Sequence, residues 1–416
     1  TLAGGGQAGD TNQVYTAAYD AGDYGITIGK NLTMTSNGDG SSIYTAGYGD
    51  VEIGGNVVMT DNGAVGDDGY LSISANHAYG DISIDGSVTM NGGAGSDSLS
   101  IYANHHKGDV TIGGAVRMNG LNGNDYMNIQ ASGYHTELTT GSVTMSGGGG
   151  DDDMFIRKYY DYNVMTVNGS VTMNGDAGYD EGQIYSYYNY YNTDFQITGS
   201  VIMNGGSQDD SLGVASYYDG LIDIGGNVTL NGNSGNDGIY VNALYGGDIG
   251  VDGKVSLLGG DGNDSLQVYT YDYYYYNSPS LVSVGSLLLD GGNGNDSLQS
   301  ISNNDYYYDS EIDVANNAQF FGGNGNDTID IRDTDVLGNF AADMGSGNDT
   351  FYMDRSTMSG NMSVNMGSGD DFLDMSNSSV TGSVSINGWF GYDDSDVYNN
   401  GNSWGAITHQ FVENIV

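Results

Sequence analysis

One stretch decides how this chain folds: Gly259-Gly260-Asp261-Gly262-Asn263-Asp264-Ser265-Leu266-Gln267-Val268. It joins a glycine-rich turn, an aspartate and a run of alternating polar and apolar residues. Glycine gives the turn access to positive φ angles, and the alternation predicts a β-strand that buries one face. Close copies begin at Gly291 and Gly322, and looser copies begin at Gly92 and Gly345. The chain is therefore expected to be built from repeats of this unit.

Two further short strands accompany each glycine-rich turn. One precedes the turn and is typified by Ser87-Val88-Thr89-Met90, and another follows at a variable distance, as in Asp109-Val110-Thr111-Ile112. The first of these recurs mostly at intervals of about 27 to 32 residues, and at about 22 residues near the C-terminus. A repeat of three short strands cannot bury its own apolar face, but it can do so when it is stacked on its neighbours.

The repeats predict an all-β fold: a single parallel β-solenoid of about 14–15 turns, with three short strands per turn and two-sided short turns at the C-terminus. Alternation assigns Val88, Met90 and their equivalents to the core. Residues 1–30 are expected to form an N-terminal partial turn, residues 31–316 a long-turn solenoid with tyrosine-rich loops, and residues 317–416 a short-turn solenoid with an end strand. The chain has 71 Gly and only 1 Pro, which suits uninterrupted strand pairing.

The charge balance is strongly acidic, with 53 Asp and Glu against 8 Lys and Arg and a net charge of −45. Such a chain cannot assemble the basic face that nucleic acid or an anionic membrane surface requires. It has no Cys, and no apolar run of about 18 residues predicts membrane insertion. Cations are the expected partners, and acidic, cysteine-free repeats predict an extracellular or cell-surface location.

The pattern Gly-Gly-x-Gly-x-Asp-x-apolar-x resembles the nonapeptide of the RTX, or haemolysin-type, calcium-binding repeat family. It is fullest at residues 259–267, 291–299 and 322–330. The resemblance implies a secreted solenoid whose stacked turns hold Ca²⁺. This chain carries one motif per turn where the family runs them in tandem, so the family's paired half-sites do not transfer directly. The aspartates that match the family's ligand position are Asp97, Asp125, Asp152, Asp210, Asp237, Asp264, Asp296, Asp327, Asp349, Asp371 and Asp393.

Electrostatics gives a separate reason to expect a cation beside these aspartates. Stacked turns would place their carboxylates about 5 Å apart, where neighbours repel by about 3 kcal/mol at an effective dielectric constant of about 20. Calcium takes carboxylate and turn-carbonyl oxygens and would relieve this repulsion. The alternative is that these Asp residues, and adjacent Asn residues such as Asn263, only form turns by bonding their own backbone.

The variable loops carry clusters of the chain's 35 tyrosines, such as Tyr159-Tyr160 and Tyr273–Tyr276. Loops at the same corner of successive turns would gather these rings along one edge. Three roles are open: contact between solenoids, stacking of a glycan, and shielding of the corner from water. The residues assigned to a contact surface are Tyr159, Tyr160, Tyr188, Tyr217, Tyr274 and Tyr307, together with Thr1 and Val416.

Head-to-tail assembly is expected because open strand edges pair readily with another chain. Val416 of one copy would then abut Thr1 of the next. The alternative is that a chain beginning at Thr1 is a processed piece of a longer polypeptide.

The sequence thus predicts an extracellular structural protein, a calcium-stabilised solenoid that assembles end to end into a surface filament or matrix fibre. The alternative is an adhesin segment that binds a glycan or a partner protein through its tyrosine-rich edge. An enzyme is not expected. The few basic residues are thinly spread, and no carboxylate pair for glycoside hydrolysis stands out among the acids.

Overall fold

The structure is a computed structural model that describes residues 2–3, 12–16, 25–45, 47–76, 79–104, 106–160, 162–188, 194–272, 279–303, 310–390, 394–396, 403–410 and 414–415. These residues are all-β and contain no helix, and hence none long and apolar enough to cross a membrane. Their strands pair in parallel, each turn against the next, which confirms the predicted β-solenoid. The chain divides into an N-terminal unit, Thr1–Gly206 with Gly220–Gly225, and a C-terminal unit, Ser207–Asp219 with Gly226–Val416.

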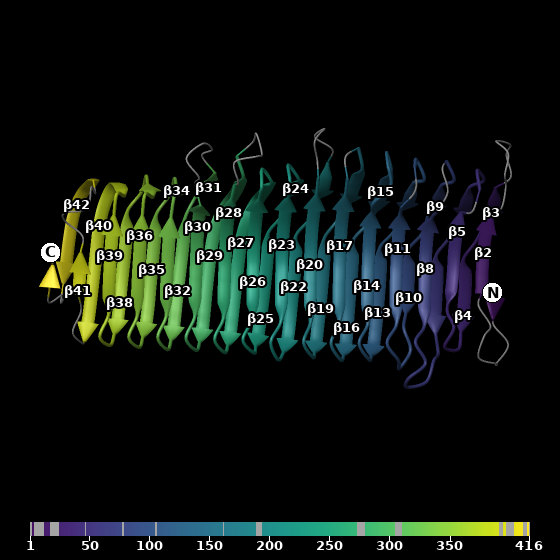
Figure 1. The fold of residues 1–416 in the computed structure, drawn as a ribbon, viewed down its shortest axis with the longest axis horizontal. Coiled ribbons are helices and arrows are strands. Elements are labelled where there is room, and N and C mark those ends of the chain that lie inside the picture. The colour runs from purple at the N-terminus through teal and green to yellow at the C-terminus, as the bar shows by residue number, and fades with distance from the viewer. Residues whose placement is uncertain are drawn as a thin grey trace. The chain divides into compact units, whose positions relative to one another are not determined.

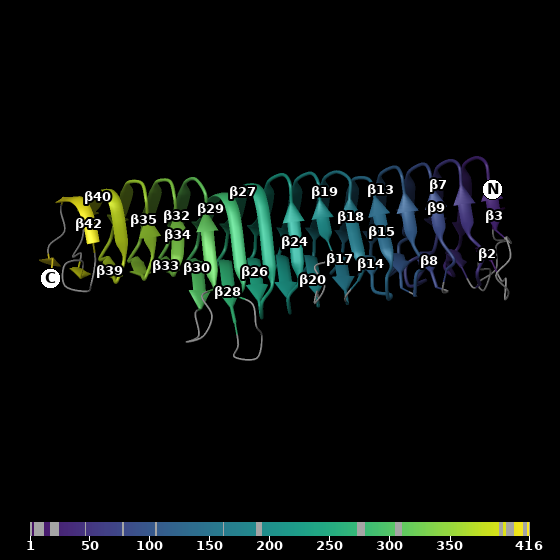
Figure 2. The same ribbon diagram turned by 90° about the horizontal axis from the view of Figure 1, so that it is seen from above.

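Each turn contributes strands to two sheets, which Figure 2 shows as two layers within the N-terminal unit. The first and third strands of a turn lie in sheet A, and the second strand lies in sheet B. A typical turn consists of β10 (Val88–Asn91), β11 (Ser98–Ala103) and β12 (Val110–Ile112). The three strands predicted for each repeat therefore form a two-layer cross-section, and the glycine-rich turn joins its layers.

The strands of the N-terminal unit follow this order along the chain (Figure 1). First strands are β1 (Leu2–Ala3), β4 (Leu32–Ser36), β7 (Val57–Asp61), β10, β13 (Val116–Asn122), β16 (Val143–Gly149), β19 (Val171–Ala177) and β22 (Val201–Ser207). Second strands are β2 (Asn12–Thr16), β5 (Ser41–Thr45), β8 (Tyr70–Ala75), β11, β14 (Tyr126–Ala131), β17 (Asp153–Tyr159) and β20 (Glu181–Tyr187). Third strands are β3 (Ile26–Ile28), β6 (Val51–Ile53), β9 (Ile82–Ile84), β12, β15 (Glu137–Thr140), β18 (Val164–Val167), β21 (Phe195–Ile197) and β24 (Leu221–Ile224).

The C-terminal unit repeats the same arrangement. Its sheet A strands are β25 (Val228–Ser234), β27 (Asp248–Asp261), β29 (Leu281–Asn293), β31 (Glu311–Val314), β32 (Ala318–Asn324), β34 (Thr334–Val336), β35 (Phe340–Ser346), β37 (Thr357–Met358), β38 (Met362–Ser368), β40 (Ser379–Phe390) and β42 (Ser403–Gln410). Its sheet B strands are β23 (Ser211–Tyr217), β26 (Gly238–Leu244), β28 (Ser265–Tyr271), β30 (Ser297–Asn303), β33 (Thr328–Arg332), β36 (Thr350–Asp354), β39 (Phe372–Ser376), β41 (Asp394–Asp396) and β43 (Asn414–Ile415).

The core consists of apolar columns, one residue per turn, as the alternation predicts. Val88 pairs with Val116 and Val116 with Val143 in residue-for-residue register, and each of the three is at most 1% exposed. The backbone of Leu2 pairs in register with Met34, so β1 continues sheet A. In the C-terminal unit the equivalent column runs through Val228, Val255 and Leu287. Each added turn therefore buries the apolar face of the turn before it.

The third strand changes form along the C-terminal unit. It runs without a break into the next first strand in β27 and β29, which have 14 and 13 residues. In the short repeats it persists as β34 and β37, of 3 and 2 residues. In the short repeats, both the first and the third strand therefore still pair in sheet A. The short repeats differ from the long repeats chiefly in the length of the loop after the second strand.

Candidate functional site

The aspartates of the predicted metal site lie in the glycine-rich turns, one per turn, with their side chains buried. Ten of the eleven fall within the described residues, and each of these is at most 3% exposed. Asp393 lies outside the described residues. We call these side chains the aspartate column of each unit.

Along the column of each unit, a carboxylate accepts a hydrogen bond from the backbone N–H of the preceding turn. In the N-terminal unit the N–H of Asp97 donates to Oδ1 of Asp125 at 2.7 Å. The N–H of Asp125 donates to Asp152 at 2.8 Å, and that of Asp152 to Asp180 at 2.9 Å. The same bond, at 2.7–2.9 Å, links the C-terminal column in the order Asp210, Asp237, Asp264, Asp296, Asp327, Asp349 and Asp371. The column is thus a side-chain ladder that runs parallel to the sheets.

The second oxygen of the carboxylate faces a glycine of its own turn. A Cβ atom on Gly120 would lie 2.2 Å from Oδ2 of Asp125, and one on Gly147 would lie 2.1 Å from Oδ2 of Asp152. Among the described residues, Oδ2 is buried without a hydrogen-bond partner in Asp125, Asp152, Asp237, Asp264, Asp296, Asp327 and Asp349. An ionised oxygen in this position would be costly, because it has lost water and gained no donor.

Burial raises the pKa of most of the column aspartates, and the backbone hydrogen bond to each carboxylate opposes this rise; for Asp125, Asp152 and Asp349, neighbouring carboxylates reinforce it. The pKa rises to about 7 for Asp125, Asp152 and Asp349. It rises to about 6 for Asp180, Asp237, Asp264 and Asp296. A proton on Oδ2 removes the like-charge repulsion within the column, and it does so without a cation.

The geometry of the column does not fit a calcium ion. Calcium takes six to eight oxygen ligands. Here Oδ1 accepts an N–H, Oδ2 packs against a glycine, and successive carboxylates belong to different turns. No group of three or more His, Cys, Asp or Glu side chains that could hold a metal occurs in the part of the chain that the structure describes. Calcium binding therefore remains a prediction of the sequence pattern, without a set of ligands in these turns.

Two aspartates of the N-terminal column, Asp180 and Asp61, were not predicted from the sequence. Asp180 follows a looser turn but has a glycine five residues earlier, at Gly175, as do most column aspartates. In one turn, Gly69 stands at the position where other turns carry the aspartate, and the carboxylate of Asp61 lies beside it. Asp61 comes from β7, accepts the N–H of Gly38 at 2.8 Å, and would collide with any Cβ on Gly69. The glycine five positions before the aspartate is the signal that finds Asp180, whereas Asp61 has no such pattern.

A second, exposed ladder runs in the opposite direction through the residue before each aspartate. In the C-terminal unit the N–H of Asn263 donates to Oδ1 of Asn236 at 2.9 Å, and the N–H of Asn295 donates to Asn263 at 2.7 Å. The asparagine side chain thus reaches forward to the next turn, while the aspartate reaches back. The suggestion that these asparagines bond their own backbone is wrong, because their bonds join successive turns.

Aromatic rings gather at one corner of the N-terminal unit, as predicted. We call Tyr48, Tyr79, His106, Tyr134, His135 and Tyr162 the aromatic edge. Ring centroids of Tyr48 and Tyr79 are 6.0 Å apart, and those of Tyr79 and His106 are 6.1 Å apart. His135 then packs on Tyr162 at 4.4 Å. These separations follow the spacing of the turns, so the edge is a continuous row of rings.

Of the predicted contact residues, Tyr159 and Tyr160 border a surface cavity in the N-terminal unit. Tyr188 is 44% exposed and packs edge-on against Tyr187, with ring centroids 4.7 Å apart. Tyr217, in the C-terminal unit, is half-buried, and burial raises the pKa of its hydroxyl. The other assigned residues, Tyr274, Tyr307, Thr1 and Val416, lie outside the described residues.

The residue directly after the second strand often has a left-handed backbone. Tyr160 and Tyr188 have φ angles of 65° and 59°, and in the C-terminal unit Asp333, Arg355 and Asn377 have φ of 47–50°. Left-handed conformations are unfavourable for residues other than glycine, least so for Asn and Asp. Tyrosine and arginine are therefore held there against their backbone preference, and such strain often marks a functional position.

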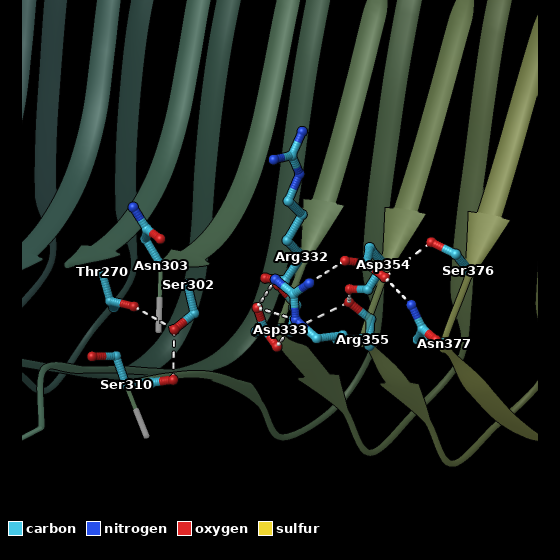
Figure 3. Close-up of polar contacts among 12 residues, drawn as sticks. Thr270, Ser302, Asn303, Ser310, Arg332, Asp333, Asp354, Arg355, Ser376 and Asn377 are labelled. Atoms are coloured by element: carbon cyan, nitrogen blue, oxygen red, sulfur yellow. Dashed lines mark hydrogen bonds and ion pairs between the residues drawn. The ribbon is translucent and has the colours of Figure 1, made fainter. Parts of the chain in front are cut away.

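In the short repeats this corner carries ion pairs in place of rings (Figure 3). Nη2 of Arg355 lies 2.7 Å from Oδ2 of Asp333, and Arg355 also contacts Asp354. Asp354 accepts hydrogen bonds from Ser376 and Asn377, both at 2.9 Å. Although burial opposes it, these bonds and the guanidinium of Arg355 lower the pKa of Asp354. The Arg355 side chain is half exposed, so these pairs contribute little to stability.

Comparison of the chain with protein-family models, with curated proteins and with solved structures gave no match. The likeness to the RTX repeat therefore rests on the nonapeptide pattern, and the solenoid fold rests on the strand pairing described above.

Proposed function

We propose that this chain is an extracellular structural protein, a β-solenoid that forms or decorates a surface fibre or matrix. The observation that supports this role is that each turn is fastened to the next by side-chain ladders in addition to strand pairing. The aspartate column and the asparagine ladder bond adjacent turns at the glycine-rich corner.

A third ladder fastens the corner before each first strand. In the C-terminal unit the N–H of Asn339 donates to Oδ1 of Asn317, that of Asn361 to Asn339, and that of Ser383 to Asn361, all at 2.9 Å. In the N-terminal unit the N–H of Asn56 and of Ser87 make the same bond to the preceding turn, also at 2.9 Å. The corner before each first strand and the glycine-rich corner after it are thus both hydrogen-bonded from one turn of the solenoid to the next.

Ladders of this kind suit a load-bearing element. A hydrogen bond contributes about 0.5–1.5 kcal/mol net, and in a repeat protein such contributions recur at every interface between turns. Bending or shearing the stack would strain the ladders at both corners together. The net charge of −45 would keep the surface hydrated and limit unspecific association, as a matrix component requires.

The proposal includes self-association as the route to a fibre, and it does not include calcium held by the aspartate column, in which Oδ1 accepts an N–H and Oδ2 packs against a glycine. Electron microscopy of the purified full chain, in buffer with a calcium chelator, tests the assembly. Filaments many chains long would support it, and particles no longer than one chain at every concentration would contradict it.

Localisation is tested on the intact source cells. Antibodies against the chain are expected to label the cell surface or the surrounding matrix. Labelling confined to the cell interior would overturn the proposed role, whatever the purified chain does.

An adhesin role is the second candidate, and one observation favours it. The outer face of sheet B in the N-terminal unit carries a cavity in which tyrosines and an arginine converge. A purely structural role does not require this feature.

A further inference from the structure

The cavity is built around Arg157, at the centre of the outer face of β17. Strand register places Gln130 beside Arg157 on β14 and Tyr185 beside it on β20. Phe155 and Tyr159 flank it along its own strand, because alternate residues of a strand share a face. Stacking of three turns thus assembles one aromatic and polar patch from strands far apart in the sequence.

The guanidinium of Arg157 is held in place by neutral groups. Its Nε donates to Oδ1 of Asn128 at 2.6 Å, and its Nη1 donates to the hydroxyl of Tyr185 at 3.0 Å. It lies 4.8 Å from the ring centroid of Phe155 and 5.9 Å from that of Tyr185. These contacts and a hydrogen bond with the Tyr159 hydroxyl fix its plane, and the five N–H donors of the guanidinium outnumber these three acceptors. A fixed guanidinium with remaining donors is prepared to bind oxygen atoms of a ligand.

A hollow of about 430 Å³ adjoins this guanidinium. It is lined by Gln130, Ser132, Arg157, Tyr159 and Tyr160. The lining combines an amide, two kinds of hydroxyl and a guanidinium with two aromatic rings. Its volume suits one or two sugar rings better than a folded partner.

Tyr160 is the exposed wall of the hollow. Its side chain is 56% exposed, and its φ of 65° is unfavourable for tyrosine. A residue without Cβ would relieve this strain, so stability alone does not explain a large ring in this place. An exposed ring beside directed donors suggests that the ring itself meets a ligand.

We propose that this hollow binds a saccharide, with one face of a pyranose ring stacked on Tyr160 and its oxygens accepting hydrogen bonds from Arg157 and Gln130. The site does not depend on the structural role proposed above, since each can hold without the other. It specifies where a glycan would bind if the chain serves as an adhesin.

The expected charge of the ligand follows from the contrast between Arg157 and the two arginines of the short repeats. Arg332 and Arg355 are each paired with a carboxylate at 2.6–2.7 Å, whereas Arg157 donates to the uncharged oxygens of Asn128 and Tyr185. Glu181, one turn away, is near enough for Arg157 to lower its pKa, although burial raises that pKa overall. A sugar carboxylate would meet a guanidinium that no protein carboxylate neutralises by contact, so uronate-containing saccharides are expected to bind more tightly than neutral ones.

Two series of soluble probes test the site: alginate oligosaccharides, which carry uronates, and cello-oligosaccharides, which are neutral. Isothermal titration calorimetry with the full chain at pH 7.5 measures both. Tyr160→Gly removes the ring and relaxes the backbone, so the variant should melt no lower than the parent while its affinity falls about tenfold or more. Tyr245→Gly makes the same change directly after another second strand, β26, where φ is 59° and the residue lies outside the lining of the hollow, and it should leave affinity unchanged.

Arg157→Lys keeps the positive charge but removes the planar fork, and it should weaken the uronate series more than the neutral series. Stronger binding of the neutral series would still support a saccharide site in the hollow, but it would overturn the expected preference for uronates. Absence of binding in both series would overturn the proposal, as would binding that Tyr160→Gly and Tyr245→Gly reduce equally. Because the microscopy of the purified chain has a separate readout, failure of this site and failure of the structural role can be told apart.

Discussion

The backbone N–H of Asp97 donates to Oδ1 of Asp125, one turn further along the chain, at 2.7 Å. Both residues are 2% exposed, so the bond is made away from water. A buried N–H without a partner is costly, and here a side chain supplies the acceptor that the irregular turn lacks. The aspartate is therefore part of the backbone hydrogen-bonding scheme of the solenoid, and its substitution has a definite consequence.

Asp125→Ala removes the acceptor and leaves the N–H of Asp97 buried and unsatisfied. The free energy of unfolding is expected to fall by about 1–3 kcal/mol. Asp125→Asn keeps Oδ1 as acceptor and places an amide N–H₂ where the unpartnered Oδ2 lies. It is expected to cost less than about 1 kcal/mol at pH 8, where the parent carboxyl is ionised. Chemical denaturation of the three proteins makes the comparison, and equal losses for Ala and Asn would contradict this role of Oδ1.

The pH dependence of stability should be the reverse of the common pattern for acids in ion pairs. An acid whose pKa is raised on folding binds more protons in the folded state, so its contribution is fully present below its unfolded pKa. That contribution is lost as the pH rises from the ordinary value of 3.8 through the folded values of about 6 to 7. The melting temperature at pH 5 is therefore expected to exceed that at pH 8 by about 5 °C or more.

The matched control replaces the three aspartates whose pKa is about 7, Asp125, Asp152 and Asp349, by asparagine. Their amides cannot titrate, so the difference in melting temperature between pH 5 and pH 8 should shrink. A parent chain that melts higher at pH 8 than at pH 5 would show that the column is stabilised in its ionised form, as a bound cation requires.

Calcium removal is the direct test of the RTX-like prediction. Because Oδ1 is engaged by N–H and Oδ2 packs against glycine, EGTA is expected to leave the circular dichroism spectrum and melting temperature of the chain unchanged. Added Ca²⁺ should likewise raise the melting temperature no more than Mg²⁺ at the same ionic strength. A loss of folded signal in EGTA that Ca²⁺ restores would establish structural calcium and refute the expectation drawn from this geometry.

The repeat pattern was sufficient to predict the fold because each turn contributes one residue to each core column. The alternation around Val88 and Met90 identified which side chains are buried, and the pairing with Val116 and Met118 followed from the repeat spacing. The arrangement of strands in two sheets was not predicted. It depends on how sharply the chain bends at each corner, and alternation carries no information about that angle.

The hydrogen bonding of the aspartate column could also not be predicted from the sequence. The motif around Asp264 identified ten buried carboxylates among the described residues, but it could not show that Oδ1 of Asp264 accepts the N–H of Asp237. The site around Arg157 was missed for a different reason. Gln130, Arg157 and Tyr185 are neighbours only through strand register, and the repeats that bring them together vary in sequence on this outer face.

Two glycines of β16, Gly147 and Gly149, provide the last test, because an added Cβ would be crowded at the first and free of close contacts at the second. A Cβ on Gly147 would lie 2.1 Å from Oδ2 of Asp152, whereas one on Gly149 would meet nothing closer than 3.5 Å. Gly147→Ala should therefore displace the buried carboxyl and cost about 1–3 kcal/mol, and Gly149→Ala should be nearly neutral. Urea unfolding of both variants gives the two losses. Equal tolerance at the two positions would mean that the carboxyl of Asp152 is free to move out of its ladder, and the column would then not be the fixed element that joins the turns.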